Sequence, residues 1–251
     1  MIVETQDLTV VFRRRWRRRA LTALDRVTLS VREGDFFALI GPNGAGKSTA
    51  LYCMLGLLRP DSGEARVLGR RLRPGCAAFR DIAYLPEEPH YHDYLTVEEA
   101  VAYYARLVGV DASAPRVRDV LERLDIGKVR STPIAACSKG MKQKVGIAHC
   151  LLHQPRLLFL DEPMRGLDPM ATKDFRSVLV DLNRGGTTIV MNSHLLPEVE
   201  LVANRVAILA NGRVAAVEDV QTLVGSDADR ARLTLEDAFV AIVRKDANTH
   251  A

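Results

Sequence analysis

Short apolar runs with the character of β-strands recur along this chain of 251 residues. Residues 2–12 and 21–32 are rich in Val, Leu and Thr, and their loose alternation of apolar and polar positions predicts two strands. Phe36–Ile40 and Leu157–Leu160 are apolar throughout, and Thr187–Met191 combines threonine with three apolar residues, which is typical of strands that are buried on both faces. These runs predict a sheet with a buried, parallel centre.

A helical period begins at Thr96. Thr96 and Glu99 match a capping box, in which each side chain bonds the other residue's backbone N–H at the start of a helix. Apolar residues then recur at intervals of three and four through residues 95–125, and residues 170–183 also have a helical pattern. Because strands alternate with helices, and no repeat or linker interrupts them, we predict an α/β fold with one catalytic unit and an inserted helical lobe.

Composition narrows the class of protein. Hydrophobic residues make up 47% of the sequence and charged residues 26%, which is ordinary for a globular protein. No apolar run approaches the roughly 20 residues of a membrane-spanning helix, and the acidic N-terminal residues do not match a secretory signal peptide. The four cysteines lack a CxxC spacing, so we expect reduced thiols in a cytoplasmic protein: Cys53, Cys76, Cys137 and Cys150.

The formal net charge of +4 is mild, but one segment concentrates basic residues. Arg13–Arg15 and Arg17–Arg19 surround Trp16 between the first two predicted strands. Such a run can bind nucleic acid, anionic lipid head groups or nucleotide phosphate, and it can equally be a solvated loop. The sequence leaves these alternatives open, and the solvated loop is the simplest of them.

A glycine-rich turn follows the apolar run Phe36–Ile40. It matches GxxxxGK[ST] and opens a predicted helix near Ser48: Gly41, Pro42, Asn43, Gly44, Ala45, Gly46, Lys47, Ser48 and Thr49. Glycines let successive backbone N–H groups point at phosphate oxygens, and the helix N-terminus adds a partial positive charge. Lys47 would neutralise the β- and γ-phosphates, and the Ser48 hydroxyl would bind Mg²⁺. This pattern therefore predicts ATP and Mg²⁺ as cofactors.

Two acidic residues follow a second buried strand. Asp161 and Glu162 come directly after Leu157–Leu160, at the carboxyl end of a strand, where α/β sheets bind ligands. Asp161 would hold Mg²⁺, directly or through water. Glu162, one residue further along, would project in a different direction from Asp161. It would polarise the attacking water as a general base. Alone this pair could be an ordinary polar loop. Together with the glycine-rich turn Gly41–Thr49, called the phosphate loop below, it predicts ATP hydrolysis.

Four further segments carry a resemblance to a known family. Cys137–Met141 occupies the place of an LSGGQ signature, and Gly166–Asp168 matches a D-loop. Glu87 stands at the Q-loop position, and His194 matches a switch histidine. With this order and spacing, the chain resembles the nucleotide-binding subunits of ABC transporters over nearly its whole length.

The resemblance implies two subunits arranged head to tail around two ATP molecules. The phosphate loop of one subunit and the signature helix of the other would hold each nucleotide. Ser138, at a helix N-cap, would face the partner's γ-phosphate together with Lys139 and Gly140. Asp168 would cross the interface and help to shape the opposite site.

The resemblance also implies which residues take part in catalysis and in nucleotide binding. His194 would contact the γ-phosphate and orient the attacking water, and an aromatic residue near the end of the first strand would stack on adenine. Phe12 fits that place, although Trp16 could serve if the arginine segment folds back. The implied catalytic residues are Glu162, His194 and Lys47, and the implied magnesium ligands are Ser48, Glu87 and Asp161.

Several residues depart from the family pattern. Glu87 replaces a glutamine and brings a negative charge near the nucleophile, while Lys139 replaces a glycine of the signature. Cys137 and Met141 also differ from the signature. This variant signature and the late segment Leu235–Phe239 resemble the subgroup that drives ABC-2-type exporters.

The resemblance further implies an architecture and partners. We expect one ABC ATPase domain over residues 1–251, with a P-loop NTPase core, a mainly parallel sheet and an antiparallel β subdomain. A helical subdomain is expected at about 88–145 and a C-terminal extension at about 215–251. The partners would be a second nucleotide-binding subunit, identical or different, and an integral membrane permease at the cytoplasmic face of the membrane. Tyr91 and Tyr94 would contact the permease, or they are ordinary surface aromatics.

Other readings are weaker. An ABC ATPase that acts on nucleic acid would suit the arginine segment, but the chain lacks the long insertions or tandem cassettes of such relatives, and we expect no nucleic-acid partner. A GTPase would need an NKxD motif, and Asn183–Gly186 lacks the aspartate. His90 and His92 could bind a metal ion, but no nearby residue completes a set of ligands.

Overall fold

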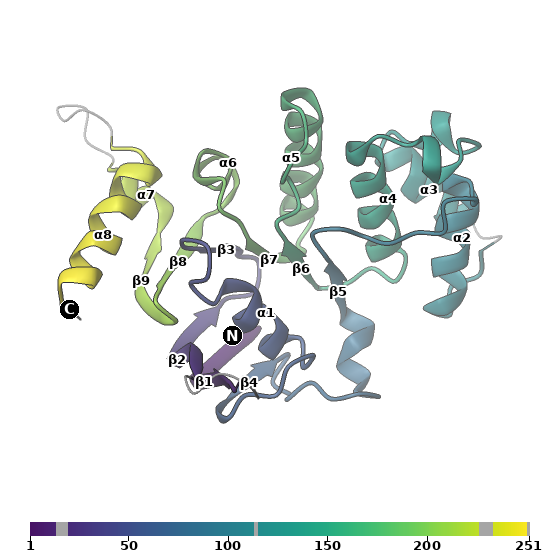
Figure 1. The fold of residues 1–251 in the computed structure, drawn as a ribbon. Coiled ribbons are helices and arrows are strands. Elements are labelled where there is room, and N and C mark those ends of the chain that lie inside the picture. The colour runs from purple at the N-terminus through teal and green to yellow at the C-terminus, as the bar shows by residue number, and fades with distance from the viewer. Residues whose placement is uncertain (14–19, 113–114, 226–232, 250–251) are drawn as a thin grey trace. The chain divides into compact units, whose positions relative to one another are not determined.

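The computed structural model describes the whole chain except residues 14–19, 113–114, 226–232 and 250–251 (Figure 1). The chain forms two compact units. The first unit consists of Met1–Phe79 and Thr188–Ala251, and the second of Arg80–Thr187. The first boundary between the two units, at Phe79 and Arg80, falls within the 3-10 helix Ala77–Asp81. Among the described residues, no helix has the length and apolar character needed to cross a membrane.

The first unit contains an antiparallel sheet with the strand order β2-β1-β4. Its strands are β1 (Val3–Phe12), β2 (Leu21–Val31) and β4 (Ser62–Val67). The central strand pairs with β2 in a register that joins Val3 to Val31 and Phe12 to Leu21. Alternate residues of β1 and β2 are buried, as expected for strands with one face against a core.

The same unit also contains the strands that carry the glycine-rich turn. All residues of β3 (Phe36–Ile40), β7 (Thr188–Asn192) and β8 (Arg205–Ala210) are buried, and β3 pairs in parallel with both neighbours. β9 (Arg213–Asp219) pairs antiparallel with β8. The helices of this unit are α1 (Lys47–Met54), α6 (Leu196–Val202), α7 (Val220–Val224) and α8 (Leu235–Thr249). Figure 1 shows α8 beside α7 and β9.

The second unit joins a strand pair to a group of helices. β5 (Ile82–Leu85) lies parallel to β6 (Leu157–Asp161), and α4 (Lys139–Leu151) contacts β5. The helices α2 (Val97–Leu107), α3 (Pro115–Arg123) and α5 (Pro169–Arg184) complete the unit. Two 3-10 helices precede α4, at Gly127–Val129 and Ile134–Ala136. α4 contacts α2, α3 and α5, so it is the central helix of the unit.

Local patterns in the sequence predicted many of these elements. The strand Phe36–Ile40 has the predicted bounds, and the capping box at Thr96 and Glu99 is present at the start of α2. The predicted helical stretch 95–125 consists of two helices, α2 and α3. Gly109, with φ of +74°, follows the end of α2, and Pro115 opens α3, because proline fits the first turn of a helix.

Candidate functional site

In the first unit, the glycine-rich turn joins β3 to α1. At Gly41 and Gly46 its backbone lies close to the backbone of other segments. Gly46 is the N-cap of α1 and adopts φ of +100°, a conformation that side chains of L-residues rarely permit. A Cβ atom on Gly41 would lie 2.3 Å from the carbonyl oxygen of Leu209. The loop therefore needs glycine at both positions. Pro42, Asn43 and Gly44 are exposed at the tip of the turn.

Lys47 is the first residue of α1 and lies in the concave side of this loop. Its Nζ atom donates hydrogen bonds to the carbonyl oxygens of Gly41, at 2.8 Å, and Pro42, at 3.2 Å. Lys47 is only 8% exposed, which is unusual for lysine. The loop thus places a buried cation beside the N-terminal end of a helix, where an anion is favoured. Ser48 and Thr49 follow within the first turn and are half-buried.

Two other predicted site residues belong to the first unit. His194 is exposed and follows the end of β7 by two residues. The neighbouring Ser193 fixes this turn, because its Oγ atom accepts a hydrogen bond from the N–H of Leu195 at 3.1 Å. Phe12 ends β1 and is 42% exposed, so its ring is available for stacking. Trp16, the alternative adenine contact, and the arginine segment from 14 to 19 lie outside the described residues.

The acidic pair of the second unit lies at the carboxyl end of β6. Asp161 is the last residue of the strand and is 4% exposed, while Glu162 is 8% exposed. Glu162 has φ of +47°, a left-handed backbone that is strained for a residue with a side chain. Strain of this kind costs about 1–3 kcal/mol and is concentrated at functional sites. The end of β6 therefore holds two consecutive buried acidic residues, and the second has an unusual backbone conformation.

Glu87 has a partner that sequence reasoning missed. Its carboxylate forms an ion pair with Arg165, which follows the acidic pair in the chain. The backbone of the same residue is also held, because the Nε2 atom of Gln143 donates to the Glu87 carbonyl oxygen at 3.0 Å. The only available sequence signal was the charge of Glu87, since a buried or half-buried carboxylate usually lies near a cation.

The signature segment forms the start of α4. Ser138 is the N-cap, and its hydroxyl accepts a hydrogen bond from the N–H of Met141 at 3.2 Å, which confirms its predicted N-cap position. The exposed Lys139 side chain lies over Gly166, because a Cβ atom there would be 3.0 Å from the lysine Nζ. Gly140 is half-buried next to Ala171. The structure thus brings the signature and D-loop segments together.

Asp168 caps the following helix. It is the N-cap of α5, and its Oδ1 atom accepts a hydrogen bond from the N–H of Ala171 at 2.9 Å. Proline at the next position supports the start of the helix. The side chain is exposed at the same time. Capping and a contact with a second subunit are compatible, because a carboxylate oxygen has two acceptor directions.

The two tyrosines proposed as partner contacts differ in environment. Tyr94 is 78% exposed and stacks on His92 with ring centroids 5.4 Å apart. Tyr91 instead lies against α4, where its hydroxyl donates to the Lys142 carbonyl oxygen at 3.3 Å. Burial raises the pKa of the Tyr91 phenol. Tyr91 is half-buried against α4, whereas Tyr94 is freely exposed, so the two tyrosines do not form one equally exposed surface, and a contact with a partner stays a prediction for both.

The predicted site residues fall into two groups, one in each compact unit. Their roles as catalytic, nucleotide-binding and metal-binding residues stay predictions. The first unit holds Phe12, Gly41–Thr49 and His194, and the second holds Glu87, Ser138–Gly140, Asp161, Glu162 and Asp168. No group of three or more His, Cys, Asp and Glu side chains forms a metal-binding cluster among the described residues.

A known protein family matches more than half of the chain. Residues 24–165 match the family model described as ABC transporter. An uncharacterised ABC transporter ATP-binding protein of Nostoc is 38% identical over 231 residues, which cover 90% of this chain and 68% of that protein. The bacitracin transport ATP-binding protein BcrA of Bacillus licheniformis is 33% identical, over 85% of this chain and 68% of that protein. The chain thus spans about two thirds of the length of these relatives.

A solved structure is similar over nearly the whole chain. It is described as the structure of an ATP-binding subunit of an ABC transporter, with 31% sequence identity and a TM-score of 0.78. The similarity covers 96% of this chain and 99% of that chain. The predicted α/β fold of the P-loop NTPase type is therefore confirmed.

Proposed function

Because this chain belongs to the ABC transporter family, as an ATP-binding subunit with an ABC-type ATPase domain, we propose that it hydrolyses Mg·ATP to drive transport through separate membrane subunits. One observation carries the proposal. The loop Gly41–Ser48 curls into the N-terminal end of α1 with Lys47 buried inside it. This geometry suits the phosphate groups of a nucleotide.

We propose that Lys47 holds the β- and γ-phosphates. In the described structure its ammonium bonds two loop carbonyls, so the cation is already positioned where the phosphates would enter. Exchanging the carbonyl partners for phosphate oxygens gives stronger hydrogen bonds, because the acceptor as well as the donor is then charged. Phe12 would stack on the adenine ring, since it is exposed at the end of β1.

Glu162 is the proposed general base. A buried carboxylate on a strained, fixed turn can accept a proton from water in a single orientation, which favours reaction. His194 would contact the γ-phosphate and orient the same water. Ser138, Lys139 and Gly140 would meet the phosphate bound by a second subunit, and Asp168 would lie at that interface.

Magnesium ions, when bound, would neutralise charge that develops on the phosphate oxygens. The proposed ligands, Ser48, Asp161 and Glu87, offer a hydroxyl and two carboxylates, the oxygen donors that Mg²⁺ prefers. The buried position of Asp161 at a strand end suits this role. Glu87 is a ligand only after it leaves Arg165, because the two are paired in this structure.

We propose three further features at the level of the assembly. The subunit would dimerise head to tail around two nucleotides, and it would bind a membrane permease at the cytoplasmic face of the membrane. Export is the proposed direction, because the BcrA relative is a bacitracin transport protein and the signature segment resembles that of ABC-2-type exporters.

The substitution Glu162→Gln tests the proposed hydrolysis. It keeps the shape of the side chain but removes the base, so we expect a loss of about 10²- to 10⁴-fold in kcat with ATP affinity unchanged. Steady-state ATPase assays and calorimetry measure the two quantities. Glu98→Gln, on the exposed face of α2, is the matched control and should keep full activity. A Glu162→Gln variant that turns over ATP at the wild-type rate would refute the assignment.

A further inference from the structure

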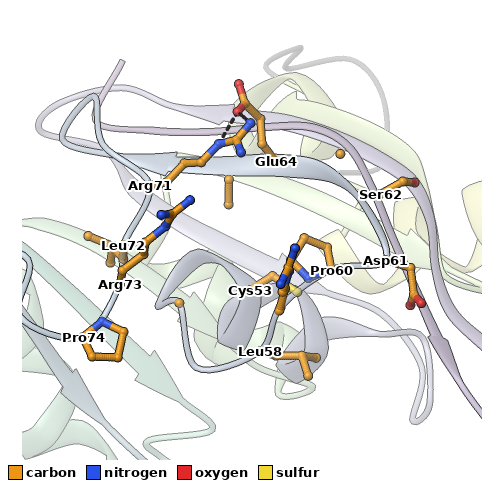
Figure 2. Close-up of a pocket in the computed structure, with 14 residues that line it drawn as sticks. Cys53, Leu58, Pro60, Asp61, Ser62, Glu64, Arg71, Leu72, Arg73 and Pro74 are labelled. Carbon is orange, nitrogen blue, oxygen red and sulfur yellow. Dashed lines mark hydrogen bonds and ion pairs between the residues drawn. The ribbon is translucent and has the colours of Figure 1, made fainter.

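A cavity of about 680 Å³ lies in the first unit and shares no residue with the phosphate loop. It is open to solvent on one side and is lined by the last turn of α1, the connection to β4, β4 itself and the segment 71–74 (Figure 2). This volume is within the range of sites that bind small molecules, about 300–1,000 Å³. The unit is closely packed around it, since a Cβ atom on Gly56 would lie 2.6 Å from the Leu72 carbonyl oxygen.

Part of the lining is apolar. Leu72 and Cys53 are 7% and 5% exposed, and Leu58, Pro60 and Ala65 are half-buried around the same hollow. Burial raises the pKa of the Cys53 thiol to about 11, so at neutral pH this sulfur is an uncharged, apolar part of the wall. These side chains can cover the hydrocarbon body of a ligand.

The charged side chains of the lining are unequally paired. Figure 2 shows Arg71 directed at Glu64, with which it forms an ion pair. The Glu64 carboxylate also accepts a hydrogen bond from Arg66 at 2.9 Å. The second acid, Asp61, accepts a hydrogen bond from the N–H of Val11 at 2.8 Å. Both carboxylates are thus engaged.

The other two arginines of the lining, Arg59 and Arg73, differ from Arg71 in their pairing. Both are exposed at the cavity, and neither forms an ion pair or a side-chain hydrogen bond with any residue that the structure describes. Their guanidinium groups therefore keep their donors for a ligand. Guanidinium binds phosphate and carboxylate through paired, parallel hydrogen bonds, which a neutral ligand cannot match.

We propose that this cavity binds a small amphipathic anion, with its phosphate or carboxylate head between Arg59 and Arg73 and its apolar body against Leu58, Leu72 and Cys53. The site is separate from the nucleotide site, but both adjoin α1. Lys47 begins this helix at the phosphate loop, and Cys53 lies in its last turn, only about two turns away. Occupancy of the cavity can therefore influence nucleotide binding through one short helix.

Hexyl phosphate is a suitable probe, because it combines an anionic head with an apolar body. Calorimetric titrations in saturating Mg·ADP, repeated without nucleotide, keep the phosphate loop from being mistaken for the cavity. We expect one site whose affinity falls about ten-fold or more in the double variant Arg59→Gln/Arg73→Gln, since each substitution removes a charge-assisted contact. The double variant Arg32→Gln/Arg70→Gln removes equal charge from exposed residues outside the cavity and should bind normally.

Three results would overturn the proposal. They are equal affinity for hexyl phosphate in the two double variants, equal affinity for hexanol and hexyl phosphate, and equal affinity for inorganic phosphate and hexyl phosphate. All four substituted arginines are exposed, so thermal unfolding should be unchanged, and ATP binding should persist in both variants. ATP hydrolysis measured in parallel separates failure of this site from failure of the ATPase assignment.

Vesicles distinguish two sources of the anionic head. Phosphatidylcholine vesicles with phosphatidylglycerol should sediment the wild type, and the cavity variant less, if the head belongs to a lipid. Because both double variants retain Arg13–Arg15 and Arg17–Arg19, any difference between them reports the cavity alone. Hexyl phosphate binding with equal vesicle binding in the two variants identifies a dissolved ligand instead. Either result supports the same recognition chemistry.

Discussion

Lys47 is the residue on which we propose that nucleotide binding depends most directly. Its ammonium is buried and fixed by two loop carbonyls, so little ordering remains when phosphates bind. We expect Lys47→Ala to weaken ATP binding itself, by about ten-fold or more, because hydrogen bonds to a charged group contribute about 1.5–3 kcal/mol each. Calorimetry with ATP measures this. Lys144→Ala, on α4, is a control lysine outside the loop, and equal ATP affinity in wild type and Lys47→Ala would contradict the prediction.

His149 makes the stability of the second unit sensitive to pH. Its ring stacks on Tyr104 with centroids 4.6 Å apart, and its Nδ1 atom is buried without a hydrogen-bond partner among the described residues. Burial, followed by the nearby charge of His153, lowers the pKa of His149 from 6.5 to about 4. Between these values the unfolded chain binds a proton that the folded chain does not. Stability is therefore expected to fall as the pH falls from 6.5 towards 4.

Urea unfolding at several pH values tests this expectation with the variant His149→Phe, which keeps an aromatic ring but cannot be protonated. The free energy of unfolding should depend less on pH between 4 and 6.5 in the variant than in the wild type. His90→Gln removes an exposed histidine of the same unit and should leave the wild-type slope unchanged. Identical slopes in wild type and His149→Phe would show that this ring is protonated in the folded state.

At the scale of elements, two loops of the second unit are joined by the ion pair between Glu87 and Arg165. Glu87 follows β5, and Arg165 follows β6, the strand that ends in the proposed catalytic pair. The side chains are 35% and 56% exposed, so the pair contributes at most about 1 kcal/mol. A bond of this strength would hold the Glu87 carboxylate when the nucleotide site is empty and would release it to Mg²⁺, if Glu87 is the magnesium ligand proposed above.

We therefore expect Arg165→Gln to lower the Mg²⁺ concentration that gives half-maximal ATPase activity, by up to about five-fold, because the competing cation is gone. The difference from wild type should shrink at high salt, which screens exposed pairs. Arg130→Gln breaks another exposed pair of the same unit, with Glu98, and serves as the control. An unchanged Mg²⁺ requirement in Arg165→Gln would rule out competition for Glu87.

Local signals in the sequence predicted the elements that carry the site. The phosphate loop, the N-cap at Ser138 and the capping box at Thr96 depend on residues within a few positions of one another, so the sequence shows them directly. The pair of Glu87 with Arg165 joins residues 78 positions apart. The inward turn of Tyr91 likewise depends on α4, where Gly146 leaves room for its hydroxyl. Such contacts follow from packing between elements, which no local pattern encodes.

At the scale of the whole molecule, the proposed transport function requires a surface for the membrane subunit. We propose that exposed aromatic residues of the second unit form it. Tyr94 stacks on His92, which in turn meets the edge of Tyr103 with centroids 5.9 Å apart. Tyr103 is 40% exposed, so the group presents apolar area with polar tips, a common composition at interfaces. This surface follows β5 and the Glu87 loop in the chain, which connects it to the proposed nucleotide-sensing residue.

The substitution Tyr94→Ala tests that surface. The side chain is 78% exposed and stacks on His92, which is not a proposed nucleotide-binding residue, so the isolated subunit should hydrolyse ATP at close to the wild-type rate. Co-purification with the membrane subunit should weaken, because a large aromatic at an interface often contributes more than 1 kcal/mol, about a five-fold change in affinity. Leu107→Ala, 65% exposed at the end of α2, is the control for loss of exposed apolar area. Normal co-purification of Tyr94→Ala, combined with loss of ATPase activity in isolation, would place Tyr94 in the catalytic machinery instead. Tyr91→Ala should behave differently from Tyr94→Ala and destabilise the second unit, because its ring packs against α4.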